Sequence, residues 1–176
     1  MSISSTLARE RSPIVAQNCR EAVRLGRNAL LAIAIARGCH HYAPFVPSHV
    51  PKIDRLDLPH EVLGCALLRG PLDVDTFQTI RCGAMILSDL GNSPQIIAEA
   101  SDGLSVASRV AHVAQVALST DDHPEYWRNL LAALPPIKAN KETSHLPGVS
   151  RFVSETRMTG LGRGALRVWL RTHYFR

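Results

Sequence analysis

Four side chains of types that bind anions alternate near the carboxyl end of the chain. Arg167, Trp169, Arg171 and His173 occupy every second position, so an extended strand would place them on one face. Guanidinium groups pair with phosphates or carboxylates, and an indole ring stacks on bases or on cations. Such a face would suit nucleic acid or an acidic protein surface. An edge strand also carries charges on its solvent side to resist aggregation, so both interpretations stay open.

This strand is part of a β-hairpin predicted at residues 151–176. Residues 151–158 and 165–174 both alternate between apolar and polar side chains, and the glycine-rich turn 159–164 separates them. Two strands alone are marginally stable in water, so the hairpin should dock on helices or pair with a second copy in a homodimer. The GLGRG run in the turn lacks the residue order of a phosphate-binding loop, and a hairpin turn explains it better. Three further arginines of the segment extend the candidate binding set: Arg151, Arg157 and Arg163.

A second basic set is predicted on one long helix from about Ile14 to Arg37. Apolar residues such as Val15, Cys19 and Val23 recur at helical spacing along it, and Gly38 is a plausible stop. Three arginines at spacings of four and three follow its polar side: Arg20, Arg24 and Arg27. A solvated helix face explains this pattern, and a surface that adds to the C-terminal arginines is the functional alternative.

The net charge of +5 is unevenly distributed along the chain. Residues 1–58 hold eight Lys/Arg against four Asp/Glu, residues 59–147 hold six against ten, and residues 148–176 hold six against one. The middle of the chain is therefore acidic while both ends are basic. This asymmetry favours an anionic partner, with nucleic acid as the leading version because the two basic ends could converge on one face.

The composition is that of an ordinary globular protein. A chain of 176 residues with 45% apolar and 20% charged residues is long enough for one domain with a real core. The longest apolar run, residues 29–36, is far shorter than the roughly 20 residues that span a bilayer. The first residues lack the hydrophobic centre of a secretory signal. We therefore expect a cytoplasmic protein with no membrane partner.

Four cysteines are spread singly, with no CxxC pair: Cys19, Cys39, Cys65 and Cys82. Each lies in or beside an apolar helical stretch. This pattern predicts reduced, buried thiols that act as small apolar residues rather than a disulfide framework.

The stretch Gly103–Ser119 predicts a buried central helix. Valine, alanine and leucine cover most of its circumference, so it should have neighbours on several sides. A narrow polar stripe interrupts them: Ser105, Ser108, Arg109, His112 and Gln115. Proline, glycine and capping residues delimit further helices at about 60–69, 74–90, 95–100 and 123–134.

The predicted fold class is mainly α, a compact bundle of five to six helices around a buried central helix, with a C-terminal β-hairpin. We expect an N-terminal arm at 1–13, a helical domain at 14–136, a polar linker at 137–150 and the basic hairpin at 151–176, docked on the helical domain. A proline-rich connection at 39–58 should wrap the surface.

A helix-turn-helix unit is an alternative for residues 88–101. Leu90-Gly91 would be the turn, and Pro94–Ser101 the recognition helix. That helix offers Gln95, Glu99 and Asp102 but no arginine or lysine, so generic helix punctuation explains the segment better.

No motif predicts an enzyme, a metal site or a cofactor. The chain has no nucleophile elbow and no zinc-protease motif, and the adjacent Cys39, His40 and His41 cannot all ligate one ion with relaxed geometry. A dispersed active site would most plausibly use His60 with Glu61, or His112 with Arg109. The favoured interpretation is a non-enzymatic binding or regulatory protein for an anionic partner. The alternative is a protein–protein adaptor or a subunit of a larger assembly.

Overall fold

The computed structural model describes residues 12–37, 58–69, 77–118, 121 and 123–136. These residues contain six α-helices and no strand: α1 (Pro13–Ala36), α2 (His60–Leu67), α3 (Phe77–Leu87), α4 (Pro94–Gly103), α5 (Ala107–Leu118) and α6 (Pro124–Ala133). The expected mainly helical class is confirmed for this part of the chain. The predicted hairpin, the linker and residues 1–11 of the predicted arm lie outside the described residues.

Proline and serine delimit several helices as the sequence predicts. Ser93 precedes α4, its hydroxyl accepts a hydrogen bond from the amide of Ile96 at 3.4 Å, and Pro94 is the first helical residue. Pro59 precedes α2, and Pro124 opens α6. Each of these residues acts locally, so it can be interpreted without knowledge of the fold.

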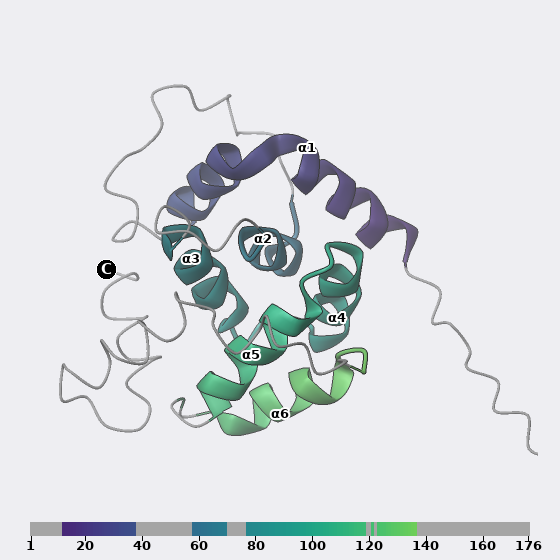
Figure 1. Ribbon diagram of the computed structural model, residues 1–176, viewed down its shortest axis with the longest axis vertical. Coiled ribbons are helices and arrows are strands. Elements are labelled where there is room, and N and C mark those ends of the chain that lie inside the picture. The colour runs from purple at the N-terminus through teal and green to yellow at the C-terminus, as the bar shows by residue number, and fades with distance from the viewer. Residues whose placement is uncertain (1–11, 38–57, 70–76, 119–120, 122, 137–176) are drawn as a thin grey trace, which may run out of the picture.

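The central helix is α2, and the prediction that residues 103–119 form the centre is wrong. All side chains from Val62 to Leu67 are buried, and α2 packs against α1, α3 and α4. Figure 1 shows the short α2 surrounded by the other helices. An eight-residue helix can be central because residues 62–68 contain no polar side chain, so every direction around it must be covered.

The chain between α4 and α5 explains why α5 begins at Ala107, four residues later than expected. Ser105 has φ 57°, and its amide bonds to the carbonyl of Asp102 at 3.1 Å. The amide of Val106 reaches the carbonyl of Ser101 at 2.8 Å. These two bonds form a Schellman motif at the end of α4, with serine where glycine is usual. Residues 104–106 therefore end α4 before α5 begins.

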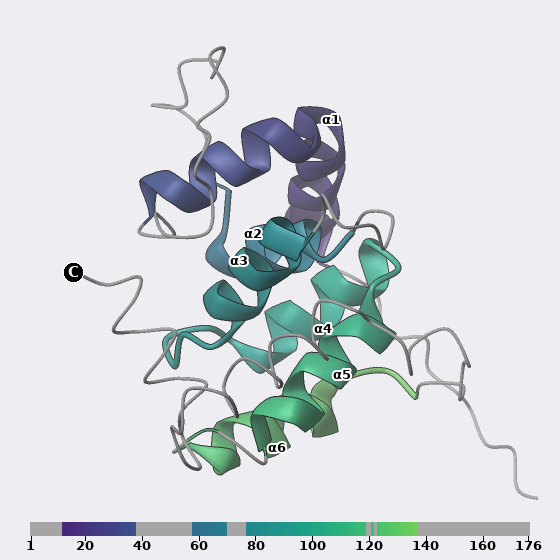
Figure 2. The ribbon, with the colours of Figure 1, turned by 60° about the vertical axis from the view of Figure 1, so that its left-hand side comes forward.

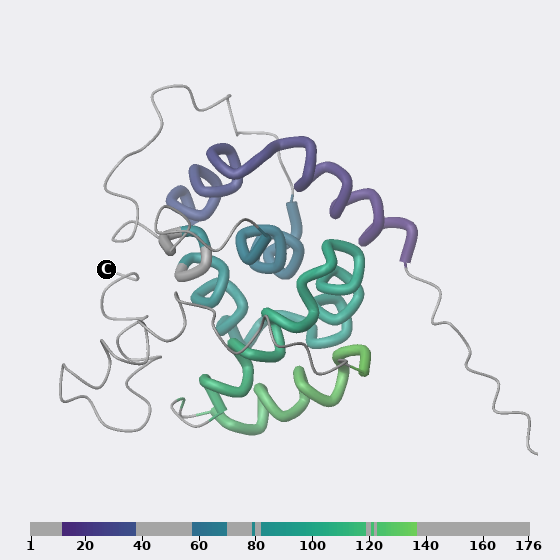
Figure 3. The backbone as a smooth tube through the Cα atoms, in the orientation of Figure 1, coloured from purple at the N-terminus to yellow at the C-terminus, as the bar shows by residue number. Residues whose placement is uncertain are grey.

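The first helix is bent, and the prediction of one continuous helix is wrong. Gly26 has φ 76° and ψ 171°, which is not a helical conformation and is essentially restricted to glycine. Figure 3 traces α1 as two helical halves joined by a short extended stretch. Val23, which precedes the bend, is 49% exposed.

The bend lets α1 cover two sides of the core. In the first half, the thiol of Cys19 lies 3.9 Å from the carbonyl oxygen of Ala100 in α4. The second half is buried continuously from Ala29 to Ala34. It ends at Arg37, whose guanidinium donates to the carbonyl of Leu58 just before α2.

Helices α2 and α3 approach each other closely. A Cβ placed on Gly83 would lie 2.9 Å from the backbone oxygen of Gly64, which cannot move aside as a side chain could.

The prediction of buried, reduced thiols is confirmed for Cys19, Cys65 and Cys82, and burial raises the pKa of Cys65. Cys39 lies outside the described residues.

Helix α6 closes the opposite side of the core from α1 (Figure 2). Trp127 and Leu130 are fully buried, and α6 packs against α5 and α4. The ring of Tyr126 meets that of Trp127 edge to face, with centroids 5.0 Å apart. The indole N–H of Trp127 donates to the carboxylate of Asp121, which holds α6 to the segment before it. The helical body, which we define as α1 to α6, is thus one packed core.

Candidate functional site

The arginines predicted on the first helix lie on the surface of α1, but they do not form a continuous row. Arg20, Arg24 and Arg27 are all exposed. The guanidinium of Arg24 makes two hydrogen bonds to the carboxylate of Glu21, at 2.6 and 2.9 Å, and this pairing lowers the pKa of Glu21. The bend at Gly26 then separates Arg27 from the other two. The first half of α1 therefore presents Arg20 together with Arg24, which is already paired with Glu21.

The other candidate residues lie outside the described part of the chain: Arg151, Arg157, Arg163, Arg167, Trp169 and Arg171. Their predicted role and the predicted hairpin stay predictions.

A cleft of about 330 Å³ lies between α4 and the end of α6, and the sequence did not point to it. Gln95, Glu99 and Asp102 line one side of it, at spacings that bring them to one face of α4. The other side is apolar and is formed by Ala132, Ala133, Leu134, Pro135 and Pro136. The cleft thus offers carboxylates beside apolar surface, a combination that suits a cationic side chain with an aliphatic stem.

The two ends of the helical body meet at this cleft. The amide of Ser12, just before α1, donates to the Glu99 carboxylate at 3.2 Å. Pro136, at the far end of the described chain, lines the same cleft as Glu99. Residues 12 and 136 therefore lie on one side of the molecule, although 123 residues separate them in sequence.

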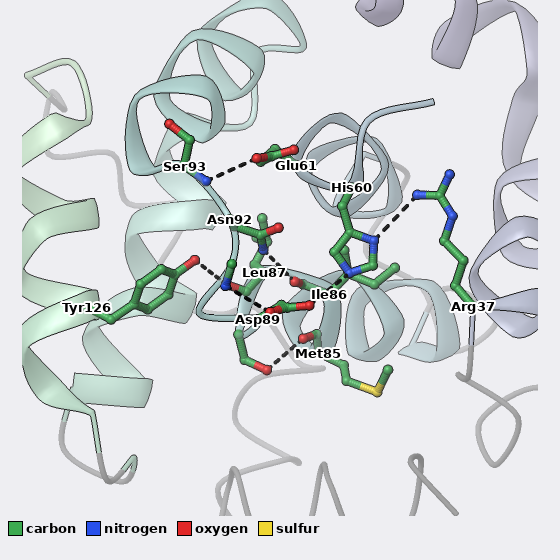
Figure 4. A network of polar contacts seen from close by, with 12 residues as sticks. Arg37, His60, Glu61, Met85, Ile86, Leu87, Asp89, Asn92, Ser93 and Tyr126 are labelled. Atoms are coloured by element: carbon green, nitrogen blue, oxygen red, sulfur yellow. Dashed lines mark hydrogen bonds and ion pairs between the residues drawn. The ribbon is translucent and has the colours of Figure 1, made fainter. Parts of the chain in front are cut away.

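The densest polar network lies where α1, α2 and the α3–α4 loop meet (Figure 4). The guanidinium Nη1 of Arg37 is 3.4 Å from Nδ1 of His60, and Nε2 of His60 is 3.7 Å from the carboxylate of Asp89. The predicted partner of His60, Glu61, turns elsewhere and accepts a hydrogen bond from the amide of Ser93 at 3.0 Å. The structure therefore does not bring His60 and Glu61 together as an acid–base pair.

The electrostatics of this network favour a neutral imidazole. A guanidinium only donates hydrogen bonds, so Nδ1 of His60 must accept from Arg37, and its proton resides on Nε2, toward Asp89. Burial and the charge of Arg37 lower the pKa of His60, while Asp89 and Glu61 oppose this shift. This arrangement orients the ring.

Other contacts in the network brace the loop at residues 88–93. The side-chain amide of Asn92 donates to the carbonyl of Ile86 at 2.7 Å, and the hydroxyl of Tyr126 donates to the carbonyl of Leu87 at 2.6 Å. Both bonds satisfy carbonyl groups that the end of α3 leaves without helical partners. The network is therefore explained by helix ends that need hydrogen-bond partners.

The second candidate pair is His112 with Arg109. The Arg109 guanidinium donates to the carbonyl of Leu68 at the end of α2, which ties α5 to the central helix. His112 is half-buried, and burial lowers the pKa of its ring. A positively charged side chain at a helix C-terminus is favourable on electrostatic grounds alone.

The helix-turn-helix interpretation does not fit the packing. Six residues, 88–93, separate α3 from α4, whereas that motif uses a turn of three or four. Both helices pack on α2. The outer face of α4 carries Glu99 and Asp102 and lines the cleft with the end of α6, so it would repel phosphates.

Within the described ranges, no three side chains of His, Cys, Asp or Glu are grouped closely enough to hold a metal ion. None of the described helices combines the length and apolar character needed to cross a membrane. Comparisons with models of protein families, with curated proteins and with solved structures find no match.

Proposed function

We propose that this protein is a non-enzymatic binding or regulatory protein that engages an anionic partner, in the first instance nucleic acid. Arginines of residues 151–171, with Trp169 among them, make the main contacts. The helical body serves as their scaffold, and the exposed arginines of α1 are a secondary contact surface.

The main support for the proposal is that the excess positive charge lies outside the packed helices. The described residues hold eight Lys/Arg and seven Asp/Glu, so the helical body is close to neutral. Residues 137–176 hold eight Lys/Arg against two Asp/Glu. A solubilising role for the arginines would be served by charge spread over the helices. Their concentration in one segment instead favours a partner that carries closely spaced negative charges.

The meeting of the two ends of the helical body supports the same proposal. Ser12, which follows residues 1–11 in sequence, bonds to Glu99, and Pro136, which precedes residues 137–176, lines the same α4–α6 cleft. Arg9 and Arg11 precede Ser12 in sequence. Basic residues from both ends therefore start from one side of the body, from which they can reach the same partner.

The proposal is tested by fluorescence anisotropy with labelled single- and double-stranded oligonucleotides. The variant replaces Arg151, Arg157, Arg163, Arg167 and Arg171 by glutamine in the full chain. Two exposed arginines outside the proposed surface are replaced in the control, Arg69→Gln with Arg128→Gln. We expect the unmodified chain and the control to bind with a dissociation constant in the micromolar range at low salt, as is typical of sequence-independent contacts. The proposal requires the five-arginine variant to bind at least about tenfold more weakly, and equal binding by all three chains would refute it.

An adaptor function is the second candidate, and one observation favours it. Val23 is 49% exposed on α1, between the exposed Arg20 and Arg24. An exposed apolar side chain flanked by arginines is typical of protein interfaces. If the oligonucleotides do not bind, an acidic protein surface becomes the favoured partner. The Val23→Ser variant should then weaken its binding, while retained affinity would exclude this face.

A further inference from the structure

The α4–α6 cleft has the chemistry of a receptor for an arginine side chain. Glu99 and Asp102 are three positions apart on α4, so their carboxylates lie on the same face. Across from them, Ala132, Leu134 and Pro135 provide apolar surface. An arginine stem can pack on apolar groups while its guanidinium bonds to carboxylates, so both sides of the cleft are matched by one side chain.

The size of the cleft limits what it can hold. A volume of about 330 Å³ is at the lower end of the range for ligand pockets. It therefore accommodates one long side chain with its flanking residues.

The occupant of the cleft that is best supported is a segment of the same chain. The cleft is lined by Pro136, and the forty residues that follow Pro136 contain six arginines and only two acidic residues. Fourteen residues, 137–150, lie between Pro136 and the first of these arginines. Fourteen residues reach at most about 46–50 Å, so the length of this connection allows the arginines to return to the cleft. The short connection also gives the segment a high effective concentration there, which favours it over a separate molecule.

We infer that the α4–α6 cleft binds an arginine side chain from residues 151–171 of the same molecule, held by Glu99 and Asp102. Docking would withhold that arginine from an anionic partner, so the cleft would restrain binding. The restraint of partner binding rests on the proposed function, whereas the docking of an arginine in the cleft does not.

The test is photo-crosslinking in the full-length protein. A benzophenone amino acid replaces Ala132, which is exposed on the cleft wall, and mass spectrometry maps the crosslinked peptide. The matched control places the same probe at Glu125, which is exposed at the other end of α6. We expect crosslinks to residues 151–171 from position 132 and not from position 125. Equal crosslinking from both positions, or crosslinks from 132 only to other segments, would overturn the inference.

A charge variant tests the role of the carboxylates. Glu99→Gln with Asp102→Asn keeps carbonyl oxygens at both positions, so Ser12 still has an acceptor at residue 99. Loss of charge-assisted hydrogen bonds should lower the crosslink yield by about tenfold. Matching melting temperatures check that the fold is kept, and an unchanged yield contradicts the assigned role of the carboxylates.

Two further readouts separate docking within one molecule from the alternatives. Mixing isotopically light and heavy protein distinguishes crosslinks within a molecule from those between copies, and crosslinks mostly between copies would exclude docking in cis. Adding a single-stranded oligonucleotide that the protein binds should lower the yield if the partner and the cleft compete. A constant crosslink yield would show that docking does not restrain oligonucleotide binding, and it would leave both the docking and the proposed function intact.

Discussion

The imidazole of His60 is the residue whose environment most constrains its chemistry. Its Nδ1 faces the guanidinium of Arg37, so protonation would place two positive groups in contact. The nearby carboxylate of Asp89 is exposed and does not reverse the effect, and the pKa of His60 is lowered. The folded state therefore prefers the neutral ring.

This preference predicts how stability depends on pH. A histidine whose pKa is lowered by folding stabilises the folded state fully above its unfolded pKa of about 6.5, and this contribution is lost as pH falls below that value. His112, whose pKa is lowered by burial, adds in the same direction. Urea unfolding from pH 8 to pH 5 should therefore show a falling free energy of unfolding.

The variant His60→Asn keeps an oxygen that can accept from Arg37 but does not titrate, so the fall should be smaller. Exposed Gln115 provides the control, because Gln115→Asn changes no titrating group. A pH dependence that is the same in His60→Asn and in the unmodified protein would contradict this account of the network.

At the scale of elements, the bend in α1 allows one helix to cover both α4 and α2. Gly26 has ψ 171°, so it lies outside the left-handed helical region in which asparagine is tolerated. A Cβ at this position would have no atom within 4 Å, so any cost of substitution comes from backbone strain and not from crowding.

Gly26→Ala should therefore lower the free energy of unfolding by about 1–3 kcal/mol. Gly26→Asn should not recover this loss, because the side chain of asparagine eases only the left-handed helical conformation. Chemical denaturation of both variants checks this. If Gly26→Asn were as stable as the unmodified protein, the backbone would not have the conformation described here.

The end of α4 gives the opposite prediction. Ser105 occupies a left-handed position, with φ 57°, and its side chain is exposed. Ser105→Gly should raise the free energy of unfolding by about 1 kcal/mol, because glycine carries no steric penalty there. Thermal unfolding measures the shift, and Ser108→Gly inside α5 is a control that should be destabilising. A loss of stability in Ser105→Gly would rule out the Schellman ending.

Much of the helix pattern could be predicted because its signals are local. Pro59, Ser93 and Pro124 mark helix starts without any knowledge of neighbours. The bend at Gly26 was missed because apolar residues continue on both sides of it. A signal for the bend is the change in pattern at Gly26. The buried residues are spaced before Gly26, and they form the continuous block Ala29–Ala34 after it.

The identity of the central helix was mistaken for a related reason. Residues 103–119 are longer and alanine-rich, but they carry a polar stripe, whereas residues 62–68 carry none. The absence of any polar side chain is the better indicator of a helix covered on all sides. The Arg37–His60–Asp89 network and the α4–α6 cleft combine residues distant in sequence, so only the packing reveals them.

At the scale of the whole molecule, a nearly neutral helical body adjoins a strongly basic segment. The body has a core that extends from α1 to α6, and both of its ends meet at one cleft. An account in which the basic residues bind an anionic partner explains why the charge is kept off the packed helices. It also makes binding depend on ionic strength in a defined way.

The salt dependence of oligonucleotide binding tests this central claim most directly. Each phosphate contact contributes about 0.9 to the magnitude of the slope of log K against log salt for duplex DNA, so five arginines contribute up to about 4.5. We predict a steep slope for the unmodified chain and for the Arg69→Gln, Arg128→Gln control. The slope should be much shallower when the arginines at 151, 157, 163, 167 and 171 are replaced by glutamine. The same slope in all three proteins, or no binding by any of them at low salt, would contradict the claim.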